Sequence, residues 1–460
     1  MTNRYDAIII GTGQAGPYLA SRLTGAGMKV AIIERGKFGG TCVNTGCIPT
    51  KTMVASAYAA HMARRGADFG VMIDGGVQVD MRRVKERHDA VSGASRKGLE
   101  TWLGGMNNLT IYHGHARFES PWEVSVGAER LASDRIFINV GGRAAAPSMP
   151  GIEQIEFLTN SSMMNVDFLP RHLLIVGGSY VGLEFGQMFR RFGSEVTIVE
   201  MAPRLVHRED EDISDGIREI LEKEGIQIRL NAKCIGFGRR GDETITHVDC
   251  TAGAPEVSST HVLLAVGRRP NTDDLGLDQA GVEVDERGFI LVDDELRTNV
   301  PGICALGDCN GRGAFTHTAY NDGEIAAANL VDHDPRRVSD RITAYALYID
   351  PPLGRAGMTE AEVRRTGRKA LIGKRPMTKV GRAVEKGETQ GFMKVLVDAE
   401  TQRILGAAIL GTGGDEAIHS ILDVMYAKAP YTVIQRAVHI HPTVSELIPT
   451  MLGGLQPLAP

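Results

Sequence analysis

The sequence lacks the features that would place it in a membrane, outside the cell or on a nucleic acid. No apolar run approaches the ~18 residues that cross a bilayer, and the first residues lack the apolar segment of a signal peptide. The 460 residues include only six cysteines, too few for a secreted disulfide framework, and the net charge of −5 gives no electrostatic case for nucleic acid. We therefore expect a cytoplasmic protein with no nucleic-acid or membrane partner.

Aromatic residues are also scarce, at 5%, and the two tryptophans, Trp102 and Trp122, are predicted to be packing residues. Glycine, in contrast, is abundant, with 55 residues, which fits several tight turns against phosphate groups. The length allows two to four domains with substantial cores.

Two cysteines, Cys42 and Cys47, stand close together in the glycine-rich stretch Gly39–Lys51. They precede Pro49 and a run of helix-compatible residues from 50 to 60, so we expect them at or near a helix N-terminus, where the helix dipole favours a thiolate. A disulfide across so short a loop stabilises a fold little, which favours redox chemistry. The alternatives are two ordinary buried cysteines or half of a metal site, but no second Cys/His group adjoins the pair to complete a zinc site.

A dinucleotide-binding pattern precedes the cysteines. A β-run at Tyr5–Ile10 leads into a G-x-G-x-x-G turn and a helical stretch over 17–25, so the helix N-terminus faces a pyrophosphate. The next strand, Val30–Glu34, ends in an acid placed to hydrogen-bond a ribose hydroxyl. The turn glycines are Gly11, Gly13 and Gly16.

The same device occurs a second time. A strand over 173–176 is followed by a turn with Ser179 where the second fingerprint glycine would be, and the strand over 196–200 ends in Glu200. Because a carboxylate there repels a 2′-phosphate, Glu200 predicts NAD(H), while Arg204 and Arg208 leave NADP(H) possible. Two nucleotide units in one chain indicate electron transfer between two dinucleotides. The turn glycines are Gly177, Gly178 and Gly182.

Together these motifs resemble the class I pyridine-nucleotide:disulfide oxidoreductases, the FAD-dependent family of dihydrolipoyl dehydrogenase, glutathione reductase and mercuric reductase. The resemblance implies an α/β fold with two Rossmann-like dinucleotide-binding domains plus a C-terminal α+β dimerisation domain, and FAD and NAD(H) as cofactors. The implied domains are FAD-binding over 1–150, NAD(P)-binding over 151–270, a second FAD-binding or central part over 271–340, and dimerisation over 341–460.

The resemblance also assigns roles to single residues. Cys42 would be the interchange thiol and Cys47 the thiolate beside the flavin. Lys51 and Glu184 would pair near flavin N5, and Tyr180 would gate the nicotinamide pocket. Val140 replaces the threonine of an Ala-Thr-Gly-like family motif. Further cofactor contacts are implied at Thr41, Gly141, Gly267 and Asp308.

The phrase from His439 to Glu446 resembles the family's histidine–glutamate dyad. A histidine that titrates near neutrality suits proton transfer to and from thiols, so His441 is the predicted proton carrier and Glu446 its orienting partner. The resemblance places this dyad in the partner subunit's active site, which implies an obligate homodimer. Cys304 and Cys309 repeat the spacing of the first pair without its glycines and are interpreted as core or near-flavin packing residues.

The short entry to the cysteines over 34–40 resembles mercuric and glutathione reductases, and the phrase Pro351–Glu360 resembles the reactive-chlorine-resistance flavoenzymes. The stretch 447–460 contains no cysteine and no metal-carrier domain precedes residue 1, which argues against mercuric reductase itself. We therefore expect a mercuric-reductase-like enzyme whose acceptor is a metal ion such as Hg(II) or Cu(II), or a small disulfide. The alternatives are a dihydrolipoyl dehydrogenase and a non-catalytic redox sensor.

Overall fold

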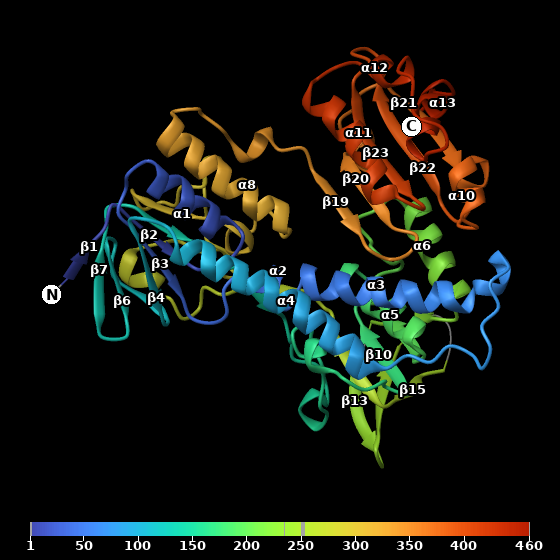
Figure 1. Ribbon diagram of the computed structural model, residues 1–460, viewed down its shortest axis with the longest axis horizontal. Helices are drawn as coiled ribbons and strands as arrows, with labels where there is room; N and C mark the ends of the chain where they lie inside the picture. Colours follow the sequence, from blue (N-terminus) through green and yellow to red (C-terminus); the bar gives the residue numbers. More distant parts are fainter. Residues whose placement is uncertain (1, 234, 250–253, 460) are drawn as a thin grey trace.

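The computed structural model describes residues 2–233, 235–249 and 254–459. Figure 1 shows three groups of elements: one from the N-terminal part of the chain, one from its middle and one from its C-terminal end. A search of the described helices found none with the length and apolar character needed to cross a membrane. The cytoplasmic location stays a prediction.

The first nucleotide-binding pattern folds into a five-stranded parallel sheet. Successive residues of its central strand enter two different apolar clusters, Ile8 and Ile10 on one face and Ala7 and Ile9 on the other, which explains the unbroken apolar run. The predicted strand over 5–10 thus begins at Ala7. In sheet order the strands are β18 (Ile303–Ala305), β8 (Ile136–Ile138), β2 (Ala7–Ile10), β3 (Val30–Glu34) and β4 (Leu109–His113), accompanied by α1 (Ala15–Gly25) and α8 (Thr316–Ala327).

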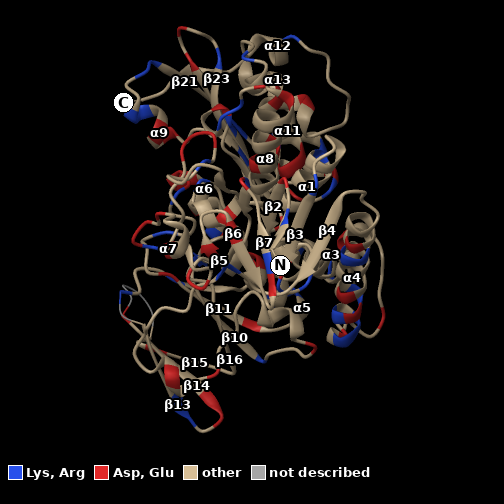
Figure 2. Cartoon of the chain, turned by 90° about the vertical axis from the view of Figure 1, so that its left-hand side faces the viewer, with Lys and Arg blue, Asp and Glu red and all other residues tan. Residues whose placement is uncertain are grey.

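Further helices and two small sheets adjoin this unit. Figure 2 shows basic and acidic residues mixed along the longest of these helices, α4 (Met81–Gly104). Trp102 and Trp122 are 48% and 60% exposed, so the prediction that they are packing residues is wrong: the first is on the solvent face of α4 and the second in a turn between strands. The other elements are α2 (Gly40–Asn44), α3 (Cys47–Arg64), β1 (Thr2–Arg4), β5 (Ala116–Ser120), β6 (Glu123–Val126), β7 (Glu129–Ala132), β9 (Gly142–Ala144), β17 (Arg268–Pro270) and α7 (Leu277–Ala280).

The second nucleotide-binding pattern folds in the same way, as a four-stranded parallel sheet with a helix after its first strand. An antiparallel three-stranded sheet extends from it (Figure 1). In sheet order the parallel strands are β12 (Gln227–Arg229), β11 (Glu195–Val199), β10 (His172–Val176) and β16 (His261–Leu264). The helices are α5 (Tyr180–Phe192) and α6 (Glu211–Lys223), and the antiparallel strands β13 (Ile235–Arg240), β14 (Glu243–Val248) and β15 (Glu256–Ser259).

The C-terminal group is a six-stranded antiparallel sheet with helices, in agreement with the predicted α+β character. In sheet order its strands are β19 (Ala344–Leu347), β20 (Leu353–Gly357), β23 (Ile404–Leu410), β22 (Phe392–Asp398), β21 (Ala370–Pro376) and β24 (Gln456–Pro457). Its helices are α9 (Glu360–Arg365), α10 (Gly381–Glu385), α11 (Gly414–Tyr426), α12 (Thr432–Gln435) and α13 (Ile448–Leu452). The predicted domain boundaries stay predictions, but β18 pairs with β8, so the chain returns to the first sheet after completing the second.

Candidate active site

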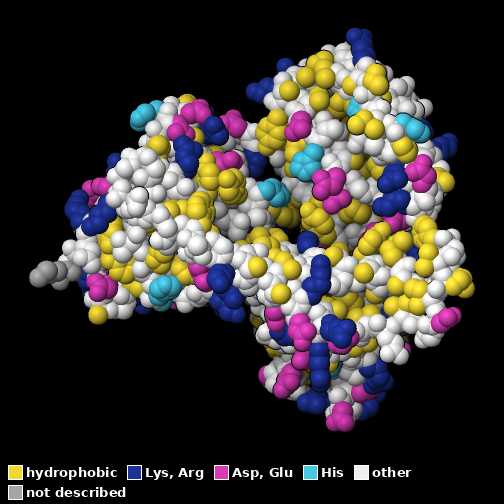
Figure 3. All heavy atoms as spheres, viewed as in Figure 1, with side chains coloured by type: hydrophobic (Ala, Val, Ile, Leu, Met, Phe, Trp, Pro, Cys, Tyr) yellow, Lys and Arg dark blue, Asp and Glu magenta, His cyan; other side chains and the backbone are white. Residues whose placement is uncertain are grey.

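A cavity of about 2700 Å³ is lined by residues from all three groups, and Figure 3 shows the surface hollowed between them. Most of the predicted site residues line it: Gly11, Gly13, Glu34, Thr41, Cys42, Cys47, Lys51, Gly141, Gly177, Gly178, Tyr180, Glu184, Glu200, Gly267 and Asp308. Gly16, Gly182, His441 and Glu446 are not part of the lining.

The first glycine turn is shaped by close backbone contacts. Gly11 has a φ of +106°, and a Cβ there would lie 2.3 Å from the Asn139 carbonyl oxygen. A Cβ on Gly16 would lie 2.3 Å from the Gly11 oxygen, so Gly16 serves helix–strand packing rather than the cavity wall. Glu34 accepts hydrogen bonds from the backbone N–H groups of Thr12, at 3.0 Å, and Gly36, at 2.8 Å. The acid therefore also fixes the turn.

The second turn repeats this construction with different residues. Gly177 has a φ of +115°, and a Cβ on Gly182 would lie 2.0 Å from the Gly177 oxygen. Glu200 accepts from the N–H groups of Gly178, at 2.6 Å, and Ala202, at 2.7 Å. Ser179 is the N-cap of α5, so a serine here leaves the strand–turn–helix geometry intact.

The cysteine pair is held where two helices meet. Cys42 is in the short helix α2, and Cys47 is the first residue of the 18-residue helix α3, where the helix dipole favours a thiolate. A hydrogen bond from Cys42 lowers the pKa of Cys47 to about 6, and Thr316 and Lys51 act in the same direction against burial. The same hydrogen bond, together with burial, raises the pKa of Cys42. The pair thus favours one thiolate and one thiol at neutral pH.

Lys51 and Glu184 form the predicted pair. Lys51 Nζ lies 2.6 Å from Glu184 Oε2, and it also lies over the ring of Tyr348, 4.7 Å from its centroid. Glu184 is buried and accepts a second hydrogen bond from the Tyr348 N–H at 3.0 Å. A residue of the C-terminal group therefore helps to fix the cation beside the cysteines.

Asp308 comes just after β18 and lines the cavity. Burial raises the pKa of its carboxyl, and the Arg268 guanidinium, 3.5 Å away, acts against that. A carboxylate held by a cation in this way is suited to accept from ligand hydroxyl groups.

Tyr180 belongs to a cluster of aromatic rings on the cavity wall. Its ring meets those of Phe315 and Tyr345 edge-on, with centroid distances of 5.9 and 5.6 Å. Phe315 stacks in turn on His317, whose Nε2 donates to the Ala344 carbonyl oxygen at 2.7 Å. Burial lowers the pKa of His317, which favours the neutral ring.

His441 and Glu446 form a hydrogen-bonded pair outside the cavity. His441 Nδ1 lies 2.9 Å from Glu446 Oε2, and the histidine side chain is 79% exposed. The neighbouring Val438 and Ile440 are 100% and 80% exposed, which is unusual for apolar residues that nothing covers. The structure thus brings the dyad together without bringing it to the cysteines of the same chain.

Several cavity residues were missed from the sequence. Thr316 is the clearest: its Oγ1 lies 3.0 Å from Cys47 Sγ although the two are far apart in the chain. Asn139 donates to the carbonyl oxygens of Gly11, at 3.3 Å, and Gly13, at 3.1 Å, and so ties the first turn to the end of β8. Tyr345 and Tyr348 also line the cavity, and nothing in the local sequence indicates which face of an isolated strand meets a cavity.

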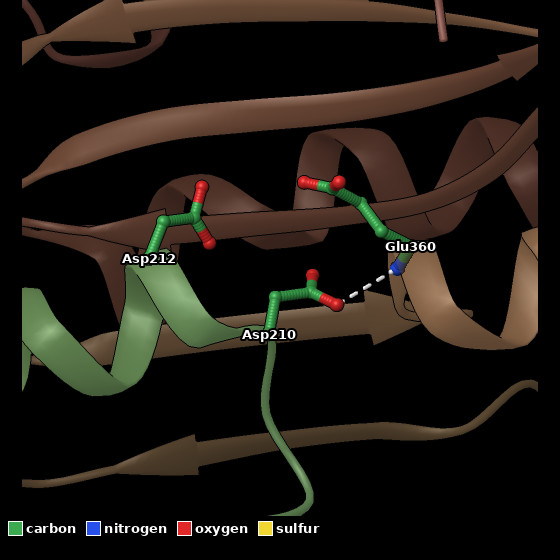
Figure 4. Close-up of side chains that lie close together, drawn as sticks. All are labelled: Asp210, Asp212 and Glu360. Atoms are coloured by element: carbon green, nitrogen blue, oxygen red, sulfur yellow. Dashed lines mark hydrogen bonds between the residues drawn. The ribbon is translucent and has the colours of Figure 1, made fainter. Parts of the chain in front are cut away.

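A cluster of carboxylates lies between α6 and the C-terminal group. Figure 4 shows Asp210, Asp212 and Glu360 converging, with Asp210 accepting from the Glu360 N–H at 2.9 Å. The spacing would suit a metal ion, but the buried Lys394 Nζ occupies the centre, 2.7, 2.8 and 2.7 Å from the three carboxylates. We therefore assign this cluster to an ion-pair network that joins two groups of elements.

The cavity fits two dinucleotides on its own geometry. Each glycine turn lies on the wall at the start of a helix, where N–H groups and the helix dipole favour a pyrophosphate, and each first glycine leaves no room for a side chain. The cysteine pair lines the same cavity as both turns.

Comparison with known proteins identifies the family. A family model described as "Pyridine nucleotide-disulphide oxidoreductase" matches residues 5–323, and that family's "dimerisation domain" matches residues 343–452. The chain therefore belongs to the pyridine nucleotide-disulphide oxidoreductases, and the predicted fold class is confirmed. It is an FAD-dependent NAD(P)H oxidoreductase of the disulfide- or metal-reducing type. The family is one of enzymes, so the alternative of a sensor without turnover is not proposed.

Relatives of three enzyme types within this family are similar to the chain over most of its length. The chain is 36% identical over 452 residues to the probable pyridine nucleotide-disulfide oxidoreductase RclA of Escherichia coli, covering 96% of this chain and 98% of that one. It is 34% identical to a dihydrolipoyl dehydrogenase of Thermus scotoductus, covering 96% and 95%, and 30% identical to a mercuric reductase of Bacillus cereus, covering 90% and 66%. A solved Cu(II) complex of the HOCl-induced flavoprotein disulfide reductase RclA of Escherichia coli matches with a TM-score of 0.89 at 34% identity, covering 98% and 99%.

Proposed function

We propose that this enzyme passes electrons from NADH to the Cys42–Cys47 pair and from there to a soft or borderline metal ion, with Cu(II) as the first candidate and Hg(II) or a small disulfide as further acceptors. The observation that carries the proposal is a thiol and thiolate pair that lines the same cavity as both nucleotide turns. Thiolate is a ligand that soft ions prefer, and the similarity to a flavoprotein solved with Cu(II) supports that choice.

Bound FAD would supply a two-electron carrier between the nicotinamide and the disulfide. Glu34 and Glu200 would hold the two glycine turns in the shape that admits a pyrophosphate, and Asp308 would accept from ligand hydroxyl groups. Lys51, fixed by Glu184, would keep a positive charge beside Cys47 and so hold its thiolate.

The reaction with copper balances in electrons and protons. The Cys42 thiol and the Cys47 thiolate together lose two electrons and one proton and form one S–S bond. Two Cu(II) ions take one electron each and become Cu(I), and the proton leaves through a base. Cys42, whose raised pKa keeps it protonated at rest, would be the sulfur that gives up this proton as the acceptor binds.

The base would be His441 of the partner subunit, oriented by Glu446. The exposure of His441 within one chain and the match to a dimerisation domain support this assignment. The test is a purified heterodimer of a Cys42→Ser chain and a His441→Gln chain. If sites are shared, one site pairs both variants and the other is intact, so about half of the parental activity returns. An inactive heterodimer would place the dyad and the cysteines in one chain.

The nucleotide would be NADH rather than NADPH. The Glu200 carboxylate is held at the second turn by the N–H groups of Gly178 and Ala202, and the 2′-phosphate of a nucleotide bound at this turn would meet its negative charge. His207, Arg208 and Lys233 also line the cavity and act against this preference. We expect kcat/KM to favour NADH by about tenfold or more; a preference for NADPH would contradict the proposal.

Dihydrolipoyl dehydrogenase is the second candidate, supported by the relative from Thermus scotoductus. Holoenzyme assayed with NADH against Cu(II), Hg(II), oxidised glutathione and lipoamide separates the two. Fast lipoamide turnover together with slow metal reduction would reject the first choice. A Cys42→Ser variant that keeps metal reduction would show that electrons reach the ion without the cysteine pair.

A further inference from the structure

The aromatic cluster on the cavity wall, Tyr180, Phe315 and Tyr345, is hydrogen-bonded through the Tyr345 hydroxyl to a buried carboxylate, that of Glu209. The hydroxyl of Tyr345 donates to Glu209 Oε1 at 2.6 Å, and Arg355 pairs with the other carboxylate oxygen. The side chains of Glu209 and Arg355 are 0% and 1% exposed. Because both oxygens are engaged away from water, the carboxylate is a fixed acceptor for Tyr345.

Tyr345 in turn touches the other rings of the wall. It stacks on Phe315, with centroids 5.5 Å apart and an interplanar angle of 15°, and meets Tyr180 edge-on at 5.6 Å. Burial and the nearby charge of Glu209 raise the pKa of both tyrosines, so both keep their protons. The three rings come from three different groups of elements, and each of them contacts the other two.

Glu209 is also tied to the second glycine turn. Its N–H donates to the Val206 carbonyl oxygen at 2.7 Å, and the Val206 N–H donates to the Gly178 oxygen at 2.9 Å. Val206 has a φ of +40°, a conformation that a β-branched residue adopts only when its surroundings impose it. The segment from 206 to 209 therefore connects the turn at Gly178 with the hydroxyl of Tyr345.

A second set of charges anchors the ion pair. Asp210, next to Glu209, binds Lys394 Nζ at 2.7 Å, and Lys394 is 1% exposed. Arg355 and Lys394 are on β20 and β22, so the acids that precede α6 are clamped to the C-terminal sheet. This clamp leaves Glu209 little freedom to follow Tyr345 if the ring moves.

We propose that Glu209 is a positioning residue for the nicotinamide side of the cavity: through Tyr345 it limits how far the Tyr180 ring moves when NAD(P)H enters. The inference rests on the proposed use of NADH and on the gate role that the family resemblance predicts for Tyr180, and not on the identity of the final acceptor. Without the hydrogen bond, the Tyr345 ring can occupy further positions, and in these Tyr180 cannot close over the ligand. The apparent affinity for NAD(P)H then falls in proportion to the fraction of molecules that keep the competent position.

The test variant is Tyr345→Phe, which removes the hydroxyl and keeps the ring. The matched control is Tyr58→Phe, because Tyr58 donates to the buried Glu388 at 2.9 Å, also links α3 to the C-terminal group, and does not line the cavity. A hydrogen bond to a charged acceptor is strong enough that we expect KM for NADH to rise about tenfold in Tyr345→Phe. With ferricyanide as acceptor, kcat should stay unchanged, and the melting temperature should fall no further than in Tyr58→Phe, which loses the same kind of hydrogen bond to a buried carboxylate.

Binding is measured separately on the holoenzyme by calorimetry with the unreactive analogue tetrahydro-NAD, whose Kd should rise by the same factor as KM. In the control Tyr58→Phe, both values should match the parent. In a Tyr180→Ala background, Tyr345→Phe should add nothing, because the route through Tyr180 is already lost.

The inference is overturned if Tyr345→Phe leaves Kd and KM unchanged while Tyr180→Ala raises them, or if the two effects multiply. If Tyr180→Ala itself changes neither value, the gate role falls and this inference falls with it. Because ferricyanide and the analogue do not involve copper, a failure of the proposed Cu(II) reaction leaves these readings unaffected.

Discussion

Cys42–Cys47 and Cys304–Cys309 are two cysteine pairs with one spacing and opposite surroundings. In the first pair, hydrogen bonds and Lys51 lower the pKa of Cys47 to about 6. In the second pair, burial raises the pKa of both thiols to about 12, and Cys309 is fully buried. Spacing therefore decides only that two sulfurs are near each other in the chain, while the surroundings decide whether either is a thiolate.

The difference comes from what each sulfur faces. Cys47 begins a long helix and lies within reach of Thr316 and Lys51, so its negative charge has partners. The Cys309 thiol is 3.2 Å from the Leu306 carbonyl oxygen, a group that can only accept and would repel a thiolate. These surroundings support the electron transfer proposed for the first pair and the packing role predicted for the second.

Serine substitutions give the largest contrast. Cys42→Ser or Cys47→Ser should lower disulfide or metal reduction by about 10³-fold or more, since the reacting bond can no longer form. Cys304→Ser and Cys309→Ser should keep turnover close to that of the parent. Steady-state assays of all four holoenzymes check this, and a large loss in the Cys304 variant would show that the second pair takes part in the reaction.

Alkylation tests the same contrast without turnover. In the NADH-reduced protein, the rate of iodoacetamide modification at Cys47 should rise as pH passes through about 6 and then level off, because the thiolate predominates above its pKa. At pH 7 Cys304 and Cys309 should react about 10²-fold more slowly, since their small thiolate fraction outweighs their greater intrinsic nucleophilicity. Peptide mass spectrometry across a pH series measures each site, and equal rates would contradict the assignment.

Removing the partners of Cys47 should make the first pair more like the second. Lys51→Met and Thr316→Val should each move the midpoint of the alkylation profile upward by about one pH unit, because each removes a stabilising contact of the thiolate. Lys51→Arg, which keeps the charge, should move it less. A midpoint that stays at the parental pH in Lys51→Met would mean that the helix start and the Cys42 hydrogen bond suffice.

The smallest expected effect is on stability. Cys309→Ala removes a fully buried sulfur and should lower the apparent melting temperature of the holoenzyme by about 1–3 °C, whereas Cys42→Ala should leave it unchanged. Thermal unfolding followed by flavin fluorescence measures both. The reverse order would mean that the first pair contributes to folding.

The sequence predicted those parts of the fold and site that depend on neighbouring residues. Both glycine turns, the strands around them and the position of Cys47 at a helix start follow from patterns a few residues long. The Lys51–Glu184 contact, which joins residues 133 positions apart, came from the family resemblance alone. Local spacing carries no information about such a pair.

What the sequence could not indicate depends on packing between distant elements. The contact of Thr316 with Cys47 and that of Tyr345 with Glu209 join residues 269 and 136 positions apart. The prediction for Trp102 and Trp122 was wrong because a large apolar side chain does not by itself find a core to enter. The separation of His441 from the cysteines of its own chain likewise requires the tertiary structure.

One face of α5 has a consequence for building hybrid enzymes. Three side chains along that face bind the segment from Tyr348 to Asp350. Glu184 accepts from the Tyr348 N–H at 3.0 Å. Gln187 accepts from the Asp350 N–H and Arg191 donates to the Asp350 carboxylate, each at 2.7 Å. A relative's C-terminal part transplanted onto this chain would therefore meet a helix whose side chains were selected for another sequence. Such a chimera needs the α5 face exchanged along with the transplant, because recombination at residue 343 alone separates groups that work as one unit.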